Sequence, residues 1–266
     1  MPNPFRLLAP KPRTIERNAF ELVLGDGRTI EVQRVRDPRA RRIKLSVDDR
    51  GARLTLPARA SAATAERFAL EHREWLAAQL DRHAPGDLPR LLPFGSTTLP
   101  LRGQDRPLRW IEGRYADLRD GGGDEGTLVF TLPPRAGERA MARALRDFYE
   151  AQARADVGRW LPHYLDGLPR APRQFRFKVM RSQWGSLAPD GTVALDLSLV
   201  LARPSAFEYV LVHELCHLIH HDHSRAFWHE VAKRCPWWQD ERAYFQAQGS
   251  RLKNTLRALL APGPVA

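Results

Sequence analysis

Residues 213–223 constrain this chain more than any other segment, because they read His-Glu-Leu-Cys-His-Leu-Ile-His-His-Asp-His. His213 and His217 are four positions apart, so a helix would place both on one face, where they can bind the same metal ion. Glu214 would lie beside that face and reach a metal-bound water without being a ligand. This spacing is typical of zinc peptidases, and it predicts Zn2+ as the cofactor and Glu214 as the catalytic acid and base.

A catalytic zinc ion usually takes three protein ligands, so the pair of histidines needs a third partner. His221 continues the same face, but on a straight helix it would lie about 12 Å from His213 along the axis, too far to share one ion. His223 is the preferred third ligand, because Asp222 and Ser224 indicate a turn there and Ser224 can cap a second helix. Other side chains stay open as alternatives: His220, His221, Glu230 and Glu241.

The spacing of the three histidines equals that of the long metzincin motif, which makes that class a candidate. The motif places a glycine where this chain has His220, and it requires a methionine turn downstream. All three methionines precede the motif, which excludes the metzincins. A purely structural zinc site is also disfavoured, because such sites are rich in cysteine and Cys216 would point away from the ligand face into the core.

Length and composition are those of a soluble globular protein. The chain has 266 residues, of which 43% are hydrophobic, enough for one sizeable domain or two small ones. We expect a cytoplasmic protein with no membrane association, since we find neither a signal segment nor a run long enough to span a bilayer. Two cysteines are too few for a disulfide framework.

The formal charge of +11 is compatible with weak association with nucleic acid. Arginine supplies most of this charge, and the chain is also rich in alanine and proline, so a compositional bias explains it equally well. Six basic residues cluster near the amino terminus: Arg34, Arg36, Arg39, Arg41, Arg42 and Lys44. They lack the interleaved aromatic residues expected of a base-stacking surface.

The first half of the chain reads as mostly strand. Residues 20–57 alternate apolar and polar side chains, with a hairpin turn at Asp49-Arg50-Gly51. Ser61 then begins a helix whose apolar stripe ends at Pro85-Gly86; the stripe consists of Phe68, Trp75, Leu76 and Leu80. Short apolar runs follow at 91–101, 108–111 and 128–132, and the glycine-rich segment 120–126 predicts a loop.

Beyond Pro134 the sequence becomes helical, with a long apolar stripe from Met141 to Leu165 that ends at Gly167. Residues 174–180 and 193–199 read as a hairpin, and the motif helix begins near Pro204. The sequence therefore predicts an α+β protein with a β-rich amino-terminal lobe, residues 1–134, and a catalytic domain, residues 135–266. We expect the two to belong to one continuous unit.

Several segments resemble the bacterial YgjP-like metallopeptidase domain, which is related to the SprT-like zinc peptidases. The resemblance rests on Gln183-Trp184-Gly185-Ser186, 191–201, 210–218, 223–228, the hairpin from Arg41 to Pro57 and the helix through Trp75-Leu76. It implies a compact zincin-like core of helices and a small sheet. His213, His217 and His223 would be the zinc ligands and Glu214 the catalytic acid and base.

The resemblance also implies that the strand after Trp184-Gly185 runs beside the cleft, where an extended peptide could add to its edge. The chain departs from the family at Leu187, where cysteine is common, and at Asp196, where asparagine is common. We expect Trp184 to be a core aromatic residue. Three residues are candidates for stabilising the oxyanion: His221, Tyr209 and Arg181.

These observations predict a zinc metallopeptidase that hydrolyses peptides or proteins. Zinc would acidify its water and polarise the scissile carbonyl, while Glu214 would take the proton and pass it to the leaving amine. The alternative is a nucleic-acid-associated zinc protein of SprT-like type that acts on DNA-bound proteins or as a scaffold. A folded protein that keeps zinc without turnover is disfavoured, because it has no need of Glu214.

Overall fold

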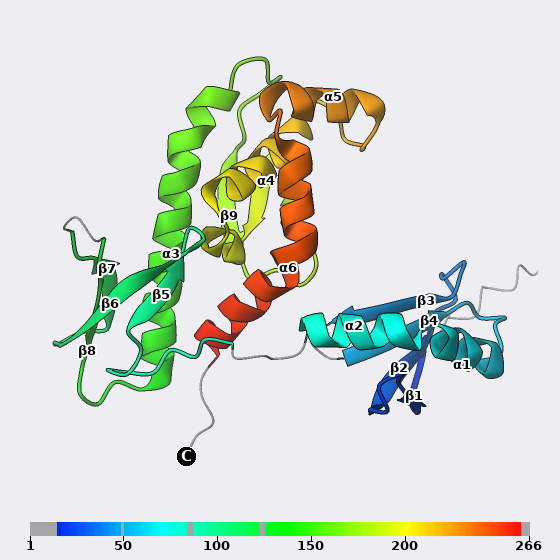
Figure 1. Ribbon diagram of the computed structural model, residues 1–266. Helices are drawn as coiled ribbons and strands as arrows, with labels where there is room; N and C mark the ends of the chain where they lie inside the picture. The colour runs from blue at the N-terminus through cyan, green and yellow to red at the C-terminus, as the bar shows by residue number, and fades with distance from the viewer. Residues whose placement is uncertain (1–14, 49–50, 84–87, 123–125, 262–266) are drawn as a thin grey trace, which may run out of the picture. The chain divides into compact units, whose positions relative to one another are not determined.

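The computed structural model describes residues 15–48, 51–83, 88–122 and 126–261, and the chain divides into two compact units, Met1–Gly86 and Asp87–Ala266 (Figure 1). The sequence predicted a division near Pro134. The structure places it after Gly86, because the strands between residues 98 and 132 share a hydrophobic core with the long helix that follows them.

The first unit is a four-stranded sheet with two helices. Its strands are β1 (Glu16–Val23), β2 (Thr29–Arg36), β3 (Lys44–Asp48) and β4 (Gly51–Leu56), in the order β1-β2-β4-β3. The predicted hairpin is confirmed, since β3 and β4 are antiparallel with Lys44 opposite Thr55, although its turn residues 49 and 50 lie outside the described residues. Alternation along β4 buries every second side chain, as expected for a sheet with one covered face.

The helix predicted from Ser61 is two helices, α1 (Ala62–Glu71) and α2 (Arg73–His83). Ser61 caps α1 as predicted, with its side chain accepting a hydrogen bond from the Thr64 amide. The backbone leaves the helical conformation at His72, so the apolar stripe does not continue in phase. Leu76 is buried, whereas Trp75 is 42% exposed, contrary to the predicted stripe. The predicted end at Pro85-Gly86 falls outside the described residues.

The second unit begins with another four-stranded sheet. It comprises β5 (Thr98–Leu101), β6 (Gln104–Glu112), β7 (Asp117–Asp120) and β8 (Leu128–Leu132), in the order β5-β6-β8-β7. β7 was not predicted, because Asp-Leu-Arg-Asp contains a single apolar residue. The sheet packs on α3 (Glu138–Trp160), the predicted long helix, which a short 3-10 turn (Leu161–Tyr164) extends.

A three-stranded sheet lies near the middle of this unit. It comprises β9 (Gln174–Lys178), β10 (Gly185–Leu187) and β11 (Thr192–Asp196), in the order β10-β11-β9. The predicted hairpin of 174–180 with 193–199 is wrong, because β9 and β11 are parallel and the antiparallel partner of β11 is β10. With only three residues, β10 is too short to show an alternating pattern.

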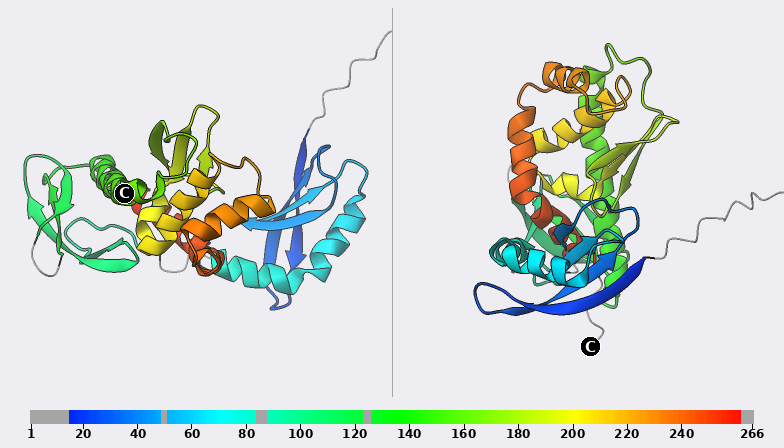
Figure 2. Two further views of the ribbon diagram at one scale, coloured as in Figure 1. Left: turned by 90° about the horizontal axis from the view of Figure 1, so that it is seen from above. Right: turned by 90° about the vertical axis from the view of Figure 1, so that its right-hand side faces the viewer.

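Three helices complete the unit: α4 (Pro204–Cys216), α5 (Arg225–Arg234) and α6 (Trp238–Leu260), preceded by a 3-10 turn at Leu197–Leu201. α4 contacts α3, α5, α6 and β10, so it is enclosed by the rest of the unit (Figures 1 and 2). This explains why α4 is apolar on almost every face. In the part of the chain that the structure describes, no helix is both long and apolar enough to cross a membrane.

Candidate active site

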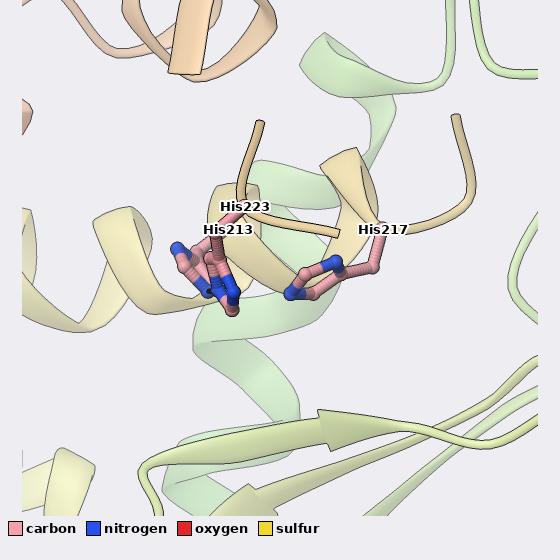
Figure 3. A group of neighbouring side chains, drawn as sticks. All are labelled: His213, His217 and His223. Carbon is pink, nitrogen blue, oxygen red and sulfur yellow. Dashed lines mark hydrogen bonds between the residues drawn. The ribbon is translucent and has the colours of Figure 1, made fainter. Parts of the chain in front are cut away.

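The motif helix α4 delivers His213 and Glu214 from its last turn, and His217 is its C-cap residue. The chain then reverses, and Ser224 caps α5 by accepting a hydrogen bond from the amide of Phe227. This turn returns His223 to the two helix histidines, with ring centroids 5.1 Å from His213 and 4.8 Å from His217 (Figure 3). The structure therefore brings all three predicted ligands together.

The geometry of the cluster suits a metal ion. One ligand nitrogen from each histidine lies within 4.8 Å of the other two, and the Nε2 atoms of His213 and His223 are 3.1 Å apart. Zinc–nitrogen bonds of tetrahedral geometry separate ligand nitrogens by about 3.4 Å, so small side-chain rotations would accommodate an ion. The Nδ1 atom of His213 is buried without a hydrogen-bond partner among the described residues. The convergence of one nitrogen from each of the three imidazoles is an arrangement that a shared cation would complete.

The surroundings of the histidines also favour metal binding. The His217 Nδ1 lies 3.0 Å from the carbonyl of His220, an arrangement in which Nδ1–H donates and Nε2 keeps its lone pair for a metal. Burial, together with the neighbouring His217, His223 and Arg242, lowers the pKa of His213 to about 3. Phe227 packs against all three rings at centroid distances of 4.9, 4.5 and 4.9 Å. The imidazoles are thus held in place, and His213 stays neutral.

Glu214 lies against the short strand β10. Its side chain is buried, and burial raises its pKa to about 8. A methyl group at Gly185 would lie 2.5 Å from the Glu214 Oε1 and 2.6 Å from its Cγ. Only glycine lets the strand pass this close to the carboxylate, a role for Gly185 that the sequence did not reveal.

The alternative ligands lie elsewhere in the structure. Glu230 forms an ion pair with Arg234, and Glu241 forms one with Arg203 at 2.9 Å. His220 contributes its carbonyl to His217. Neither these residues nor His221 join the three-histidine cluster found among the described residues.

A cleft of about 370 Å³ opens beside His213 and Glu214. Its lining is Ser182, Gln183, Trp184, Gly185, Tyr209, Val210, His213, Glu214, Arg242, Phe245 and Gln246. Of the three oxyanion candidates, Tyr209 lines the cleft, with its ring centroid 6.1 Å from that of His213. His221 and Arg181 are not part of this lining.

A buried lysine holds the loop that forms one wall of this cleft. Lys253 of α6 forms an ion pair with Asp196 at 3.0 Å and donates hydrogen bonds to the carbonyls of Met180 and Gln183 at 3.2 and 2.9 Å. Its ammonium group also lies 4.3 Å from the ring centroid of Trp184. Asp196 in turn accepts a hydrogen bond from the amide of Met180 at 2.6 Å. We call Lys253, Asp196 and residues 180–184 the loop clamp.

The loop clamp depends on Asp196, at a position where the resemblance led us to expect asparagine. An asparagine at position 196 could accept hydrogen bonds but could not balance the charge of Lys253, whereas Asp196 does both. Sequence reasoning missed Lys253, although its position between Leu252 and Leu256 on the apolar side of α6 was a signal that its ammonium group is drawn inward. Trp184 is half-buried and packs on the core, as predicted.

Comparisons with known proteins identify the family. The model of the YgjP-like metallopeptidase domain matches residues 41–248. No curated protein matches the chain. Among solved structures, the crystal structure of the metallopeptidase zymogen of Pyrococcus abyssi abylysin is similar over 39% of this chain and 95% of its own, at 23% identity and a TM-score of 0.26. The family match covers most of the chain, and it bears out the resemblance noted in the sequence: the protein belongs to the YgjP-like metallopeptidase family.

Proposed function

We propose that the protein is a zinc-dependent peptidase with a zincin-like core, in which His213, His217 and His223 bind the metal and Glu214 is the general acid and base. One observation supports this most strongly: three imidazoles whose ligand nitrogens lie within 4.8 Å of one another share a cleft with a buried carboxylate. Three neutral ligands leave a fourth position open, as catalytic zinc sites require.

Zinc bound there would supply Lewis acidity, which polarises a carbonyl group and acidifies water. Glu214 performs the proton transfers. Its raised pKa belongs to a buried carboxyl group without a counter-charge, and a nearby cation favours the ionised form that can accept a proton. The carboxylate then takes a proton from the attacking water and returns it to the leaving amine. Gly185 keeps this carboxylate in place.

The substrate would bind as an extended peptide along β10. This strand is at the edge of its sheet, so one side of its backbone is available for pairing. Tyr209 lines the same cleft and has a hydroxyl group that could donate a hydrogen bond to the developing oxyanion, which makes it the candidate that the geometry favours. Burial raises its pKa to about 12, so it keeps its proton at neutral pH.

Metal removal tests this proposal. Peptide hydrolysis should disappear after dialysis against a chelator and return when stoichiometric zinc is added, with magnesium as the control because it prefers oxygen ligands. Hydrolysis that persists in the metal-free protein would overturn the proposal.

Both cysteines are free and buried, in keeping with the cytoplasmic location that we also propose.

A second candidate function, association with nucleic acid, rests on the basic cluster of the first unit. Arg39, Arg41, Arg42 and Lys44 are exposed there. The other two members serve the fold, because Arg34 pairs with Glu66 and Arg36 donates to backbone carbonyls. A titration with duplex DNA at increasing salt tests the idea: affinity should fall steeply, by about one power of the salt concentration per phosphate contacted. Binding without this dependence would exclude it.

A further inference from the structure

Arg242 places a positive charge in the cleft beside the proposed metal site. It lies in the first turns of α6, its side chain is exposed, and it lines the cleft together with His213 and Glu214. Its guanidinium group lies 5.6 Å from the ring centroid of Trp228. The same ring is 5.8 Å from that of His213, so stacking holds the guanidinium group near the ligand cluster.

This arginine has no carboxylate partner within 4 Å among the described residues, unlike two nearby cations, Arg203 before α4 and Lys253 of α6. Arg203 pairs with Glu241, and Lys253 pairs with Asp196. Among the described residues that line the cleft, the only carboxylate is that of Glu214, which is buried against β10. The cleft therefore presents a guanidinium group whose planar donors are available to a bound molecule.

We propose that Arg242 binds a carboxylate of the substrate, so that this peptidase prefers an acidic side chain or a free carboxy-terminus close to the bond that it cleaves. Arginine suits this role, because its fork of N–H donors pairs with both oxygens of a carboxylate. Gln246, one helical turn further along α6, and Gln183 line the same cleft and offer amide groups to the neighbouring backbone. This inference rests on the proposed peptidase function.

Two rival mechanisms would give different behaviour. The overall charge of +11 would attract every acidic peptide, whether or not Arg242 is present. A role for Arg242 in the transition state alone would alter the hydrolysis of all peptides by the same factor, mainly through kcat. Recognition of a substrate carboxylate predicts instead a charge-selective change, mainly in KM.

Matched fluorogenic peptides that differ only in Glu, Gln or Lys at each position flanking the cleaved bond test the proposal. Each is made with a free and with an amidated carboxy-terminus, which separates a side-chain carboxylate from a terminal one. The wild type should favour the acidic or free-acid peptide over its Lys or amide counterpart by about tenfold in kcat/KM, the size of one charge-assisted hydrogen-bonded pair at a partly exposed site.

Arg242→Gln should remove this preference and Arg242→Glu should reverse it. Arg251→Glu is the matched control, because Arg251 is an exposed arginine of the same helix outside the cleft lining, and it should keep the wild-type preference. An equal loss for all peptides in Arg242→Gln, or a preference that survives this change, would overturn the inference.

Binding of the same peptides to the zinc-loaded Glu214→Gln variant, measured by fluorescence anisotropy, separates this inference from the proposed function. Charge-selective binding that depends on Arg242 supports the inference even if the wild type hydrolyses no peptide, an outcome that would defeat the peptidase proposal alone. Turnover by the wild type together with charge-independent binding would defeat the inference alone.

Discussion

The two units of this protein differ in what they bury. Among the described residues, the core of the first unit is wholly apolar, and each of its ion pairs has at least one exposed member, such as Glu66 in its pair with Arg34. All the buried polar and charged residues that the structure describes lie in the second unit: Asp156, Thr192, Asp196, Ser198, Glu214, Glu241, Lys253 and Thr255. Burying a charged group costs free energy, so the presence of all the described buried charges in one unit needs an explanation.

Most of these charged groups act on the cleft. Glu214 lines it, the pair of Asp196 and Lys253 fixes the loop 180–184, and Glu241 anchors α6 one residue before Arg242. Asp156 is the exception, because it joins α3 to Arg102 in the β5–β6 turn. The comparison indicates that the first unit buries apolar groups only, whereas the second gives up apolar packing around the candidate site.

The largest effect should come from changing the proposed third ligand. His223→Ala should reduce peptide hydrolysis by on the order of 10³-fold or more and should lower the zinc content of the purified protein, because two histidines cannot hold a catalytic ion. His221→Ala, which alters a neighbouring histidine outside the cluster, is the control and should retain both. Zinc content and kcat/KM are measured on both variants. Loss of zinc and activity in His221→Ala, with both retained in His223→Ala, would make His221 the ligand.

Breaking the loop clamp should destabilise the second unit far more than breaking an exposed pair destabilises the first. Lys253→Met leaves Asp196 as an uncompensated buried charge, which should lower the free energy of unfolding by about 3–5 kcal/mol. Glu66→Gln removes the exposed partner of Arg34 and should cost less than about 1 kcal/mol. Urea unfolding of each variant measures both values.

The double variant Lys253→Met/Asp196→Asn sharpens this prediction. It removes the unpaired charge and should recover part of the lost free energy of unfolding, since the asparagine side chain keeps an acceptor for the Met180 amide. If Lys253→Met and Glu66→Gln lowered the free energy of unfolding equally, the buried charges of the second unit would matter no more to stability than the exposed pairs of the first.

Gly185→Ala should damage the site more than the fold. Its methyl group would push against the Glu214 carboxylate, so we expect kcat to fall by about 10- to 100-fold and the free energy of unfolding by about 1–3 kcal/mol. Gly158→Ala is the control: a methyl group there meets no atom within 4 Å, and alanine in a helix should stabilise α3 by about 0.5–1 kcal/mol. A fully active Gly185→Ala variant would contradict the contact with Glu214.

The last prediction concerns the stability of the metal-free protein and not its activity: stability should depend on pH, because burial disfavours the charged form of Glu214. The pKa of Glu214 is raised from 4.5 to about 8 in the folded state. The folded protein therefore binds more protons than the unfolded chain between these values. The stabilisation that this proton provides is present below pH 4.5 and is lost as the pH rises through 8. Thermal melts should show the wild type losing stability relative to Glu214→Gln over this interval, and parallel curves would refute the shift.

The sequence predicted the helices and strands whose apolar residues recur at a clear period, and it predicted the site residues whose spacing along a helix is fixed. The hairpin of β3 and β4, the Ser61 cap and α3 follow from local patterns. The meeting of His223 with His213 followed from the turn that Asp222 and Ser224 favour. In each case the information lies within a few residues of the chain.

The features that escaped prediction depend on contacts between distant residues. No local pattern marks β10, which only the family resemblance led us to expect, and the role of Gly185 is recognisable only by its approach to Glu214. Lys253 acts on carbonyls about seventy positions earlier in the chain. Trp75 was misplaced because the break at His72 changed the phase of the helix. Sequence patterns report burial along one element and carry no such tertiary information.

The central claim, that Glu214 is the acid and base of a three-histidine zinc site, is tested most directly by measuring zinc stoichiometry and peptide hydrolysis together in the wild type and in Glu214→Gln. We predict one zinc ion per chain in both proteins and hydrolysis by the wild type only, with a rate at least about 10²-fold above that of the variant. A wild type without stoichiometric zinc, or a Glu214→Gln variant that hydrolyses peptides at the wild-type rate, would contradict the claim.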